Sequence, residues 1–427
     1  MQPQSYGDFS SILHQKMGDQ RAPLNVTIET SYRCPLTCAH CYNNLPMADR
    51  QARSSELSYQ EHCRILDEIT EAGCFWLLYT GGEIFARRDF LDIYTYAKQK
   101  GLLITLFTNG TMISPRIADY LTKWRPFSIE ITLYGHTRET YEGLTGIPGS
   151  YDRCRRGIRL LMERNLPLKL KTVGVSINKH EIWDMKRWVE EDLGLNFKFD
   201  SMINPRIDCS QSPLATRLTP EEIVALDLED PGRKSAWTEH TQASVDRMHL
   251  WADGDEVYQC GGAIRSCSID PYGKLRLCVL SHQDSYDLRE GSFREGWEDF
   301  LFQVRHKKRT RLTKCVACGL REMCGMCPAN GELENEDPEQ PVDFLCHVAH
   351  LRAHAVGLEV PPHGDCEYCE AGEHYPELMR SLAALEEGSA AEELASMRNE
   401  RSSFLPVLSE EPAAAAGACG GGCGSCS

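Results

Sequence analysis

Two hydrophobic periods alternate along the first half of the chain. Six short apolar runs have the length and residue content of buried strands, and amphipathic stretches of helical period lie between them. The helix predicted over Tyr59–Ala72 has clear boundaries, because Ser58 and Glu61 form a capping box at its start and Gly73 follows its end. The predicted strands are Asn25–Thr30, Phe75–Thr80, Leu103–Thr108, Ser128–Leu133, Leu168–Ile177 and Phe197–Ile203, and the other predicted helices are Asp89–Lys100, Pro115–Trp124, Tyr151–Asn165 and Glu181–Asp192.

Six strand–helix repeats predict an α/β fold with parallel strands and right-handed crossovers. Such strands form either a barrel or an open doubly wound sheet. In both arrangements ligands bind at the carboxyl ends of the strands. We therefore expect a functional site in the segments that directly follow the strands.

Three cysteines follow the first predicted strand, in the run Cys34-Pro-Leu-Thr-Cys38-Ala-His-Cys41. A loop of this length can place three thiolates on one iron–sulfur cluster, which normally takes four. The missing ligand leaves one iron open to a chelating small molecule, as in a catalytic zinc site with a free position. The same cysteines are also compatible with part of a zinc site or with buried apolar thiols.

The spacing of Cys34, Cys38 and Cys41, with His40 before the last cysteine, resembles the motif of the radical SAM enzymes. That resemblance implies a partial (β/α)6 TIM-type barrel and a [4Fe-4S] cluster on the three thiolates. It also implies that S-adenosylmethionine binds the open iron through its amino and carboxylate groups. Reductive cleavage of this cofactor would then yield a 5′-deoxyadenosyl radical that takes a hydrogen atom from a substrate.

Other strand ends carry further family features. Thr80-Gly81-Gly82-Glu83 follows the second strand, where glycines let the backbone approach a ligand closely, and the matching family segment holds the methionine amino group. Asn109 ends the third strand in an Asn-Gly pair, which is also an ordinary turn. Related enzymes carry Ser and Asp near the ribose where this chain has Thr132 and Tyr134, so Tyr134 is a departure. The resemblance thus implies cofactor contacts from His40, Gly81, Gly82, Glu83, Asn109 and Thr132, and it identifies no catalytic acid or base.

Composition narrows the class of protein. The 427 residues carry a formal net charge of −16, which argues against nucleic-acid binding. No apolar run approaches the roughly 20 residues of a membrane span, and the N-terminus lacks the regions of a signal peptide. We therefore expect a cytoplasmic protein without membrane association. In that reducing compartment, 20 cysteines favour metal or cluster ligation over disulfides.

A second cysteine-rich region lies between residues 260 and 346. Its eight thiolates suit two fully ligated four-iron clusters, and they would also suit two zinc sites of four thiolates each. Their order, with Gly273 before the third cysteine, resembles the SPASM domain, the twin-cluster extension of radical SAM enzymes that modify peptides and proteins. That family typically has three residues in the last short gap, where this chain has two. The resemblance implies one auxiliary [4Fe-4S] cluster on Cys260, Cys267, Cys278 and Cys327 and another on Cys315, Cys318, Cys324 and Cys346.

Both resemblances together imply a radical SAM enzyme that matures a ribosomally made peptide by a thioether, carbon–carbon or similar crosslink. Sulfatase-maturing enzymes are an alternative, but they carry Asp after the cysteine that matches Cys278, where this chain has Val279. Enzymes of the PQQ and mycofactocin pathways are also similar, so a peptide-derived cofactor is a further alternative. A non-catalytic iron–sulfur electron carrier is an alternative of another class, although a carrier needs no cofactor pocket.

The implied partners are a peptide or small-protein substrate and a flavodoxin- or ferredoxin-type electron donor. Only about 24 residues precede the first strand, so a leader-binding domain is not expected and a separate leader-binding protein would take its place. Six segments are expected: an extension (1–24), the barrel (25–205), a connector with one helix (206–255), a SPASM-like region (256–370), a helical extension (371–404) and a flexible Cys/Gly-rich tail (405–427).

Five cysteines remain outside these cluster sets at the C-terminal end. Cys366 and Cys369 are expected either to bind a metal with His363 or His374 or to be a reduced surface pair. The tail is expected to be a flexible segment with reactive thiols or, alternatively, to occupy the substrate channel. Its cysteines are Cys419, Cys423 and Cys426.

Overall fold

The computed structural model describes residues 6–17, 20–246, 255–321 and 324–386. The predictions for the tail cysteines Cys419, Cys423 and Cys426, and for the helical extension beyond residue 386, lie outside these residues. Within them, none of the helices combines the length and apolar character needed to span a bilayer.

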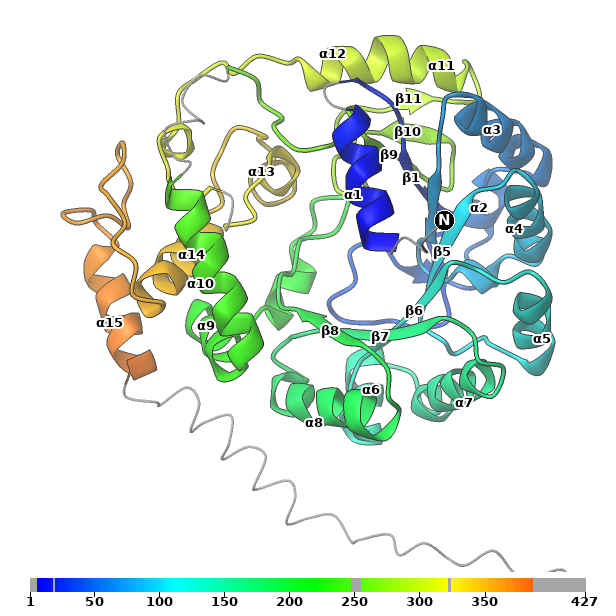
Figure 1. Cartoon of the computed structure of the whole chain (residues 1–427), viewed down its shortest axis with the longest axis horizontal. Helices are drawn as coiled ribbons and strands as arrows, with labels where there is room; N and C mark the ends of the chain where they lie inside the picture. Colours follow the sequence, from blue (N-terminus) through cyan, green and yellow to red (C-terminus); the bar gives the residue numbers. More distant parts are fainter. Residues whose placement is uncertain (1–5, 18–19, 247–254, 322–323, 387–427) are drawn as a thin grey trace, which may run out of the picture.

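One curved sheet of nine strands organises the molecule, in the order β11-β10-β9-β1-β4-β5-β6-β7-β8 (Figure 1). The strands from β9 to β8 run parallel, as the strand–helix repeats predict, and the partial-barrel α/β fold is confirmed. The six predicted strands are all present, as β1 (Asn25–Glu29), β4 (Trp76–Thr80), β5 (Leu103–Thr108), β6 (Ser128–Leu133), β7 (Leu168–Val173) and β8 (Phe197–Asp200).

Alternate residues of the strands serve the two faces of the sheet. Val26, Leu77 and Ile104 belong to the main hydrophobic core with the surrounding helices. Thr27 and Leu78, one position along, line a cavity inside the barrel. The strand period therefore separates a packing face from a functional face.

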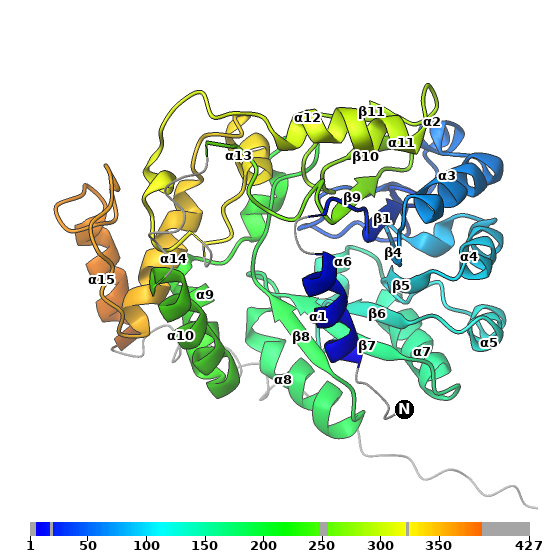
Figure 2. The same cartoon turned by 45° about the horizontal axis from the view of Figure 1, so that its top comes forward.

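The predicted helices cover the outer face of the sheet (Figures 1 and 2). The capping box of Ser58 and Glu61 is present. The predicted helix over Glu181–Asp192 is α-helical only to Arg187 and ends in a π-helical turn. The observed bounds are α3 (Tyr59–Glu71), α4 (Phe90–Gln99), α5 (Pro115–Lys123), α7 (Ser150–Met162), α8 (Ile182–Arg187) and the π-helical turn η3 (Trp188–Asp192).

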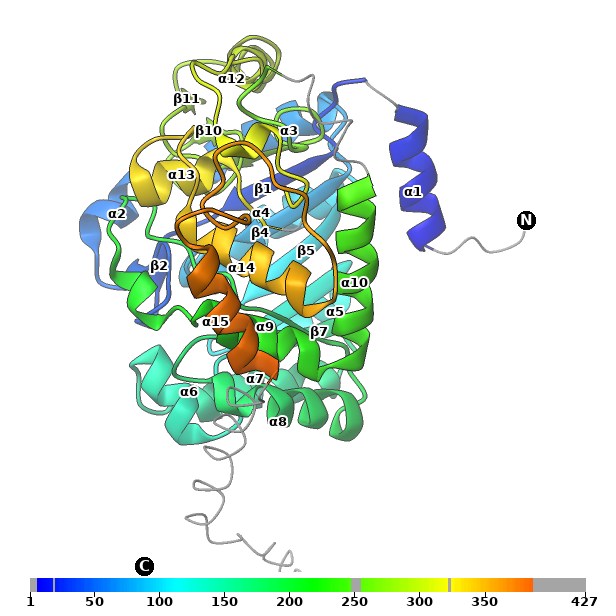
Figure 3. The same ribbon diagram turned by 90° about the vertical axis from the view of Figure 1, so that its left-hand side faces the viewer.

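Helix α1 (Tyr6–Met17) was not predicted from the sequence. Its Tyr6 ring lies 4.6 Å from Phe127, just before β6, and its Phe9 ring lies 5.8 Å from Phe75, just before β4. Figure 3 shows α1 and β2 on opposite sides of the sheet. Helix α1 therefore covers the amino ends of the strands, away from the predicted site.

The cysteine-rich region extends the barrel sheet. Strand β9 (Ser266–Ile269) pairs in parallel with β1, and β10 (Lys274–Arg276) and β11 (Tyr286–Asp287) continue it in antiparallel order (Figure 2). The sequence patterns had predicted no strand here. The two cysteine-bearing regions therefore share one hydrogen-bonded sheet.

A group of helices packs beside the barrel (Figures 1 and 3). The predicted connector helix is present as α9, capped by Thr219 and Glu222, but the connector holds a second helix, α10. The group comprises α9 (Pro220–Glu229), α10 (Pro231–Asp246), α14 (Asp343–Ala355) and α15 (Tyr375–Glu386). The remaining elements are β2 (Arg33–Cys34), β3 (Leu45–Pro46), α2 (Arg50–Ser55), η1 (Ile84–Ala86), α6 (Arg138–Thr145), η2 (Lys179–Glu181), η4 (Ser212–Thr216), α11 (Phe293–Glu295), η6 (Gly296–Phe300), α12 (Leu301–Arg305), η7 (Lys314–Val316) and α13 (Pro328–Asn335).

Candidate active site

The three-cysteine loop is held at the carboxyl end of β1 by backbone hydrogen bonds. Its start lies in β2, which pairs with β3. The Thr37 amide donates to the Thr145 carbonyl at 2.9 Å, and the Cys41 amide donates to the Cys38 carbonyl at 3.1 Å. The loop is thus fixed both to itself and to the end of α6.

Most predicted cofactor-binding residues surround one cavity of 360 Å³ inside the barrel. It opens at the carboxyl ends of the strands, where a parallel α/β sheet binds ligands. The predicted residues that line it are Cys34, Cys38, His40, Cys41, Gly81, Gly82, Asn109 and Thr132.

The thiols of the loop lie in an apolar environment. Burial raises the pKa of Cys34 to about 12, and it also raises the pKa values of Cys38 and Cys41. Asn109 Nδ2 lies 3.5 Å from Cys34 Sγ as a donor, and the Tyr134 hydroxyl hydrogen-bonds to Cys38. Thiolates at such positions need a positive group to offset their desolvation, which a metal centre provides.

Two glycines bring the end of β4 against the start of the cysteine loop. The Gly82 amide donates to the Ser31 carbonyl at 2.7 Å, and the Glu83 amide donates to the Arg33 carbonyl at 3.1 Å. A Cβ atom on Gly82 would lie 2.5 Å from the Tyr32 carbonyl oxygen. Only glycine allows this approach, so the turn and the loop form one unit.

Glu83 is not among the described residues that line the cavity. Its buried carboxylate accepts hydrogen bonds from Thr108 Oγ1 at 2.7 Å, the Asn109 amide at 2.9 Å and the Phe85 amide at 3.2 Å. Contact of Glu83 with a cofactor stays a prediction; in the structure its side chain ties the ends of β4 and β5 together behind the glycine turn.

Lys171 of β7 is a cavity residue that the sequence patterns did not single out. Its Nζ lies 3.2 Å from Glu130 Oε2 and 2.9 Å from the centroid of the Phe107 ring. Burial lowers the pKa of Lys171 to about 8. The lysine in a predicted strand was the available signal, and the pairing of β7 with β6 decides that it faces the cavity.

A buried carboxylate supports the end of the cysteine loop. Glu29 accepts hydrogen bonds from the Tyr42 hydroxyl at 2.9 Å and from Asn43 Nδ2 at 2.8 Å, and Asn43 Oδ1 in turn lies 3.6 Å from Cys41 Sγ. Burial raises the pKa of Glu29 to about 7. Glu29, the last residue of β1, is thus linked to Cys41 through the side chain of Asn43.

Three of the four cysteines predicted for the first auxiliary cluster lie together. The pKa of Cys278 is raised to about 11, chiefly by burial and in smaller part by the nearby thiols of Cys327 and Cys260. Val279, the next residue, lines the barrel cavity. The cavity therefore extends from the three-cysteine loop to the edge of this second thiol group.

Cys267 is separated from that group. It lies in β9 opposite Val26 of β1, and both side chains belong to the main hydrophobic core. Burial raises the pKa of Cys267, and the thiol that contributes to this is Cys74. The expected fourth ligand is thus turned into the layer between sheet and helices, because strand pairing fixes which face it occupies.

The cysteines of the second predicted auxiliary set do come together. Burial raises the pKa of Cys318, and the other three thiols of the set add to this. The set lines one small cavity and consists of Cys315, Cys318, Cys324 and Cys346.

Cys366 and Cys369 are not a surface pair. Their exposed fractions are 5% and 7%, and they lie beside His350 and His363. The sequence had suggested His363 but not His350, which lies on α14, 16 residues before Cys366.

Residues 28–189 match the family model described as the Radical SAM superfamily. An AdoMet-dependent heme synthase of Methanosarcina barkeri is 24% identical over 340 residues, covering 74% of this chain and 96% of the relative. A PqqA peptide cyclase of Granulibacter bethesdensis is 27% identical over 356 residues, covering 79% of this chain and 92% of the relative.

The fold is also similar to a solved structure. Streptococcus suis SuiB bound to precursor peptide SuiA superposes with a TM-score of 0.59 at 17% identity, covering 81% of this chain and 82% of SuiB. The family match contains the three-cysteine loop, the glycine turn and most of the strands around the cavity. The chain therefore carries a radical SAM region over residues 28–189.

Proposed function

We propose that this enzyme modifies a peptide, maturing a ribosomally made precursor by forming a crosslink such as a thioether or carbon–carbon bond. One observation carries the proposal. A single cavity is lined at one side by the three-cysteine loop and the glycine turn, and it also reaches Val279 beside the second thiol group. A substrate in this cavity would lie between a radical-generating centre and an auxiliary centre.

The residues present fit the expected cofactors. Cys34, Cys38 and Cys41 would hold a [4Fe-4S] cluster, since their buried thiols need a compensating positive centre. The buried Nδ1 of His40, a residue that lines the cavity, has no hydrogen-bond partner among the described residues, so a polar atom of a bound cofactor could satisfy it. When bound, the cluster and S-adenosylmethionine supply a 5′-deoxyadenosyl radical that removes a hydrogen atom from the substrate.

The protein side chains orient and enclose these groups. The backbone of Gly81 and Gly82 leaves room for a close approach, and Asn109 and Thr132 offer polar atoms to the cavity. Lys171 offers a cation inside the barrel, which suits a carboxylate of a peptide substrate. The apolar neighbours of these groups exclude water from a reactive intermediate.

Two auxiliary centres complete the proposal. Cys315, Cys318, Cys324 and Cys346 would hold one [4Fe-4S] cluster with four thiolates. Cys260, Cys278 and Cys327 would hold the other with three thiolates. Such clusters suit the transfer of an electron from the product, and a flavodoxin- or ferredoxin-type protein would supply the reducing electron.

The choice of a peptide rests on the relatives. The Granulibacter relative is named a peptide cyclase, and the SuiB structure contains a precursor peptide. The similarity to the heme synthase of Methanosarcina supports a competing assignment, in which the substrate is a heme precursor. Val279 after Cys278 argues against the sulfatase-maturase alternative, and the cofactor-sized cavity argues against a pure electron carrier.

The first experiment tests the radical chemistry. Protein reconstituted anaerobically with iron and sulfide is reduced and incubated with S-adenosylmethionine, and 5′-deoxyadenosine is measured by mass spectrometry. We expect release by the wild type and none by a variant in which Cys34, Cys38 and Cys41 are all alanine. No release by fully reconstituted wild type would overturn the assignment.

The second experiment tests the substrate. Short peptides encoded beside the gene are co-expressed with the enzyme, with a leader-binding protein if one is encoded there, and analysed by mass spectrometry. We expect a mass loss that corresponds to removed hydrogen atoms, localised to one crosslink. Turnover of a heme precursor with every peptide left unmodified would favour the competing assignment.

A further inference from the structure

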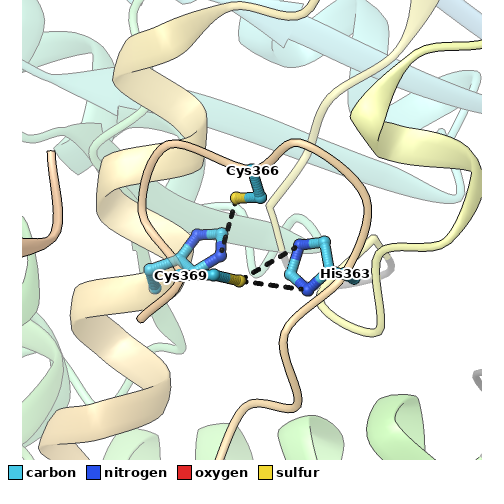
Figure 4. A group of neighbouring side chains, drawn as sticks. His363, Cys366 and Cys369 are labelled. Carbon is cyan, nitrogen blue, oxygen red and sulfur yellow. Dashed lines mark hydrogen bonds between the residues drawn. The ribbon is translucent and has the colours of Figure 1, made fainter. Parts of the chain in front are cut away.

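Four side chains outside the proposed cluster sets converge at the C-terminal end of the described chain. Their ligand atoms, one from each of His350, His363, Cys366 and Cys369, all lie within 4.8 Å of one another. No other group of three or more His, Cys, Asp or Glu residues in the described ranges meets that criterion. Figure 4 shows the loop residues His363, Cys366 and Cys369 turned towards one another.

The side chains are buried and contact one another in pairs. Cys366 Sγ lies 3.5 Å from His350 Nε2, and Cys369 Sγ lies 3.4 Å from His363 Nδ1 and 4.0 Å from its Nε2. All four are at most 7% exposed. Two thiols and two imidazoles are thus enclosed together, each sulfur in contact with one ring.

Each imidazole also lies beside a backbone carbonyl. His350 Nδ1 lies 2.8 Å from the Cys346 carbonyl, and His363 Nδ1 lies 3.0 Å from the Pro361 carbonyl. A ring N–H donated to a backbone carbonyl leaves the opposite Nε2 as a lone-pair donor, which is the usual arrangement of metal-binding histidines. His350 thus directs its Nε2 at the Cys366 thiol, whereas the ring of His363 lies against the Cys369 thiol with Nδ1 at 3.4 Å and Nε2 at 4.0 Å.

The loop backbone has the form of a short metal-binding turn. Cys366 and Cys369 are separated by two residues, and the Cys369 amide donates to the Cys366 carbonyl at 3.3 Å. Gly364, two residues before Cys366, has a positive φ of 51° that sharpens the entry to the turn. This spacing is typical of structural zinc sites, which take four nitrogen and sulfur ligands in tetrahedral geometry.

We propose that His350, His363, Cys366 and Cys369 bind one structural Zn²⁺ ion. The ion would join the loop after residue 358 to α14, the helix that also carries Cys346 one turn before His350. Zinc suits the mixed nitrogen and sulfur ligands, and it carries no redox chemistry that would compete with an adjacent iron–sulfur cluster.

Cys366 also lies near the second auxiliary set, since its thiol raises the pKa values of Cys315 and Cys346. Cluster ligation by Cys366 is therefore the competing assignment. It is disfavoured because the second auxiliary set already supplies four thiolates. It also leaves His350, His363 and Cys369 without a function at the same centre.

The test measures zinc and iron in protein purified anaerobically from zinc-supplemented medium. We expect about one zinc per chain, and X-ray absorption at the zinc edge should show two sulfur ligands near 2.3 Å and two nitrogen ligands at about 2.0–2.1 Å. Cys369→Ser should lose the zinc and keep the iron. His374→Asn is the matched control, because His374 stacks on Tyr368 beside the site but is outside the ligand group, and it should keep both metals.

A second variant, which should still bind the metal, distinguishes the loss of a ligand from misfolding of Cys369→Ser. His363→Cys should keep the zinc and change its ligand shell from two sulfurs to three. Absence of zinc from the wild type would overturn the proposal, as would zinc that survives Cys369→Ser. Loss of iron with unchanged zinc in Cys369→Ser would assign this cysteine to the cluster instead.

Discussion

The close packing of the glycine turn against the cysteine loop predicts a specific effect of one added methyl group. In Gly82→Ala the new Cβ would lie 2.5 Å from the Tyr32 carbonyl oxygen and 2.7 Å from that of Arg33. Real Cβ atoms essentially never approach heavy atoms closer than 3.0 Å, so the two backbones must separate by at least about 0.5 Å (3.0 − 2.5). Both neighbours are backbone atoms, which cannot rotate away as a side chain would.

The shift moves the two halves of the cofactor site apart. A displacement approaching 1 Å at a reacting centre can cost about 100-fold in rate, so we expect Gly82→Ala to slow S-adenosylmethionine cleavage by about 10- to 100-fold. The cysteine loop keeps its own ligands, so iron content should stay at the wild-type level. The assay is 5′-deoxyadenosine release in a single turnover, with iron measured on the same sample.

Gly143→Ala is the matched control. Gly143 lies on the exposed side of α6 with no heavy atom within 4 Å of an added Cβ, and alanine favours a helix. It should release 5′-deoxyadenosine at the wild-type rate. A Gly82→Ala enzyme that matches this control would show that the close approach of turn and loop is not needed for cofactor cleavage.

Three further predictions concern buried polar groups. Lys171→Met should leave cofactor cleavage in the absence of substrate unchanged and raise the KM for the peptide at least about 10-fold. Lys171→Arg, which keeps the positive charge, should retain much of the affinity. Equal KM values for the wild type and both variants would exclude substrate binding by this cation. Burial raises the pKa of Glu29 from its ordinary 4.5 to about 7, so the folded protein binds a proton that the unfolded chain releases. This proton adds about 3 kcal/mol to the free energy of unfolding. The contribution is complete below pH 4.5 and is lost as the pH rises through about 7. Thermal unfolding midpoints between about pH 6 and 8 should therefore fall with pH in the wild type and change less in Glu29→Gln; parallel profiles would refute this. Tyr134→Phe removes the hydrogen bond to Cys38, so the cluster potential should become more negative in an EPR-monitored titration while iron content is retained; an unchanged potential would show that the hydroxyl does not tune the cluster.

The barrel could be predicted from local patterns because its strands and helices carry their own boundaries. The capping boxes at Ser58 and Thr219 are present in the structure as expected. The strand expected over Leu168–Ile177 ends at Val173, because Asn178 accepts from the Val175 amide and donates to the Val173 carbonyl, which turns the chain. Such side-chain turns compete with strand pairing and are not visible in hydrophobic periodicity.

The rest depended on contacts between residues distant in the sequence. Cysteine spacing alone grouped Cys267 with three other thiols, whereas its pairing opposite Val26 turns it into the core. Spacing likewise could not find His350, because its partners come from a loop beyond the end of its helix. The position of Lys171 inside the barrel needed the register of β7 on β6, which pairs Thr132 with Lys171.

The pairing of β9 with β1 decides whether the two halves of the enzyme can be separated. Four residues of β9 cover the free side of β1 in continuous parallel register. A protein truncated before residue 255 would leave the backbone donors and acceptors of β1 exposed along one edge, and such edges recruit other chains. The catalytic half is therefore not an independent module, and a shortened version should aggregate instead of yielding a minimal enzyme.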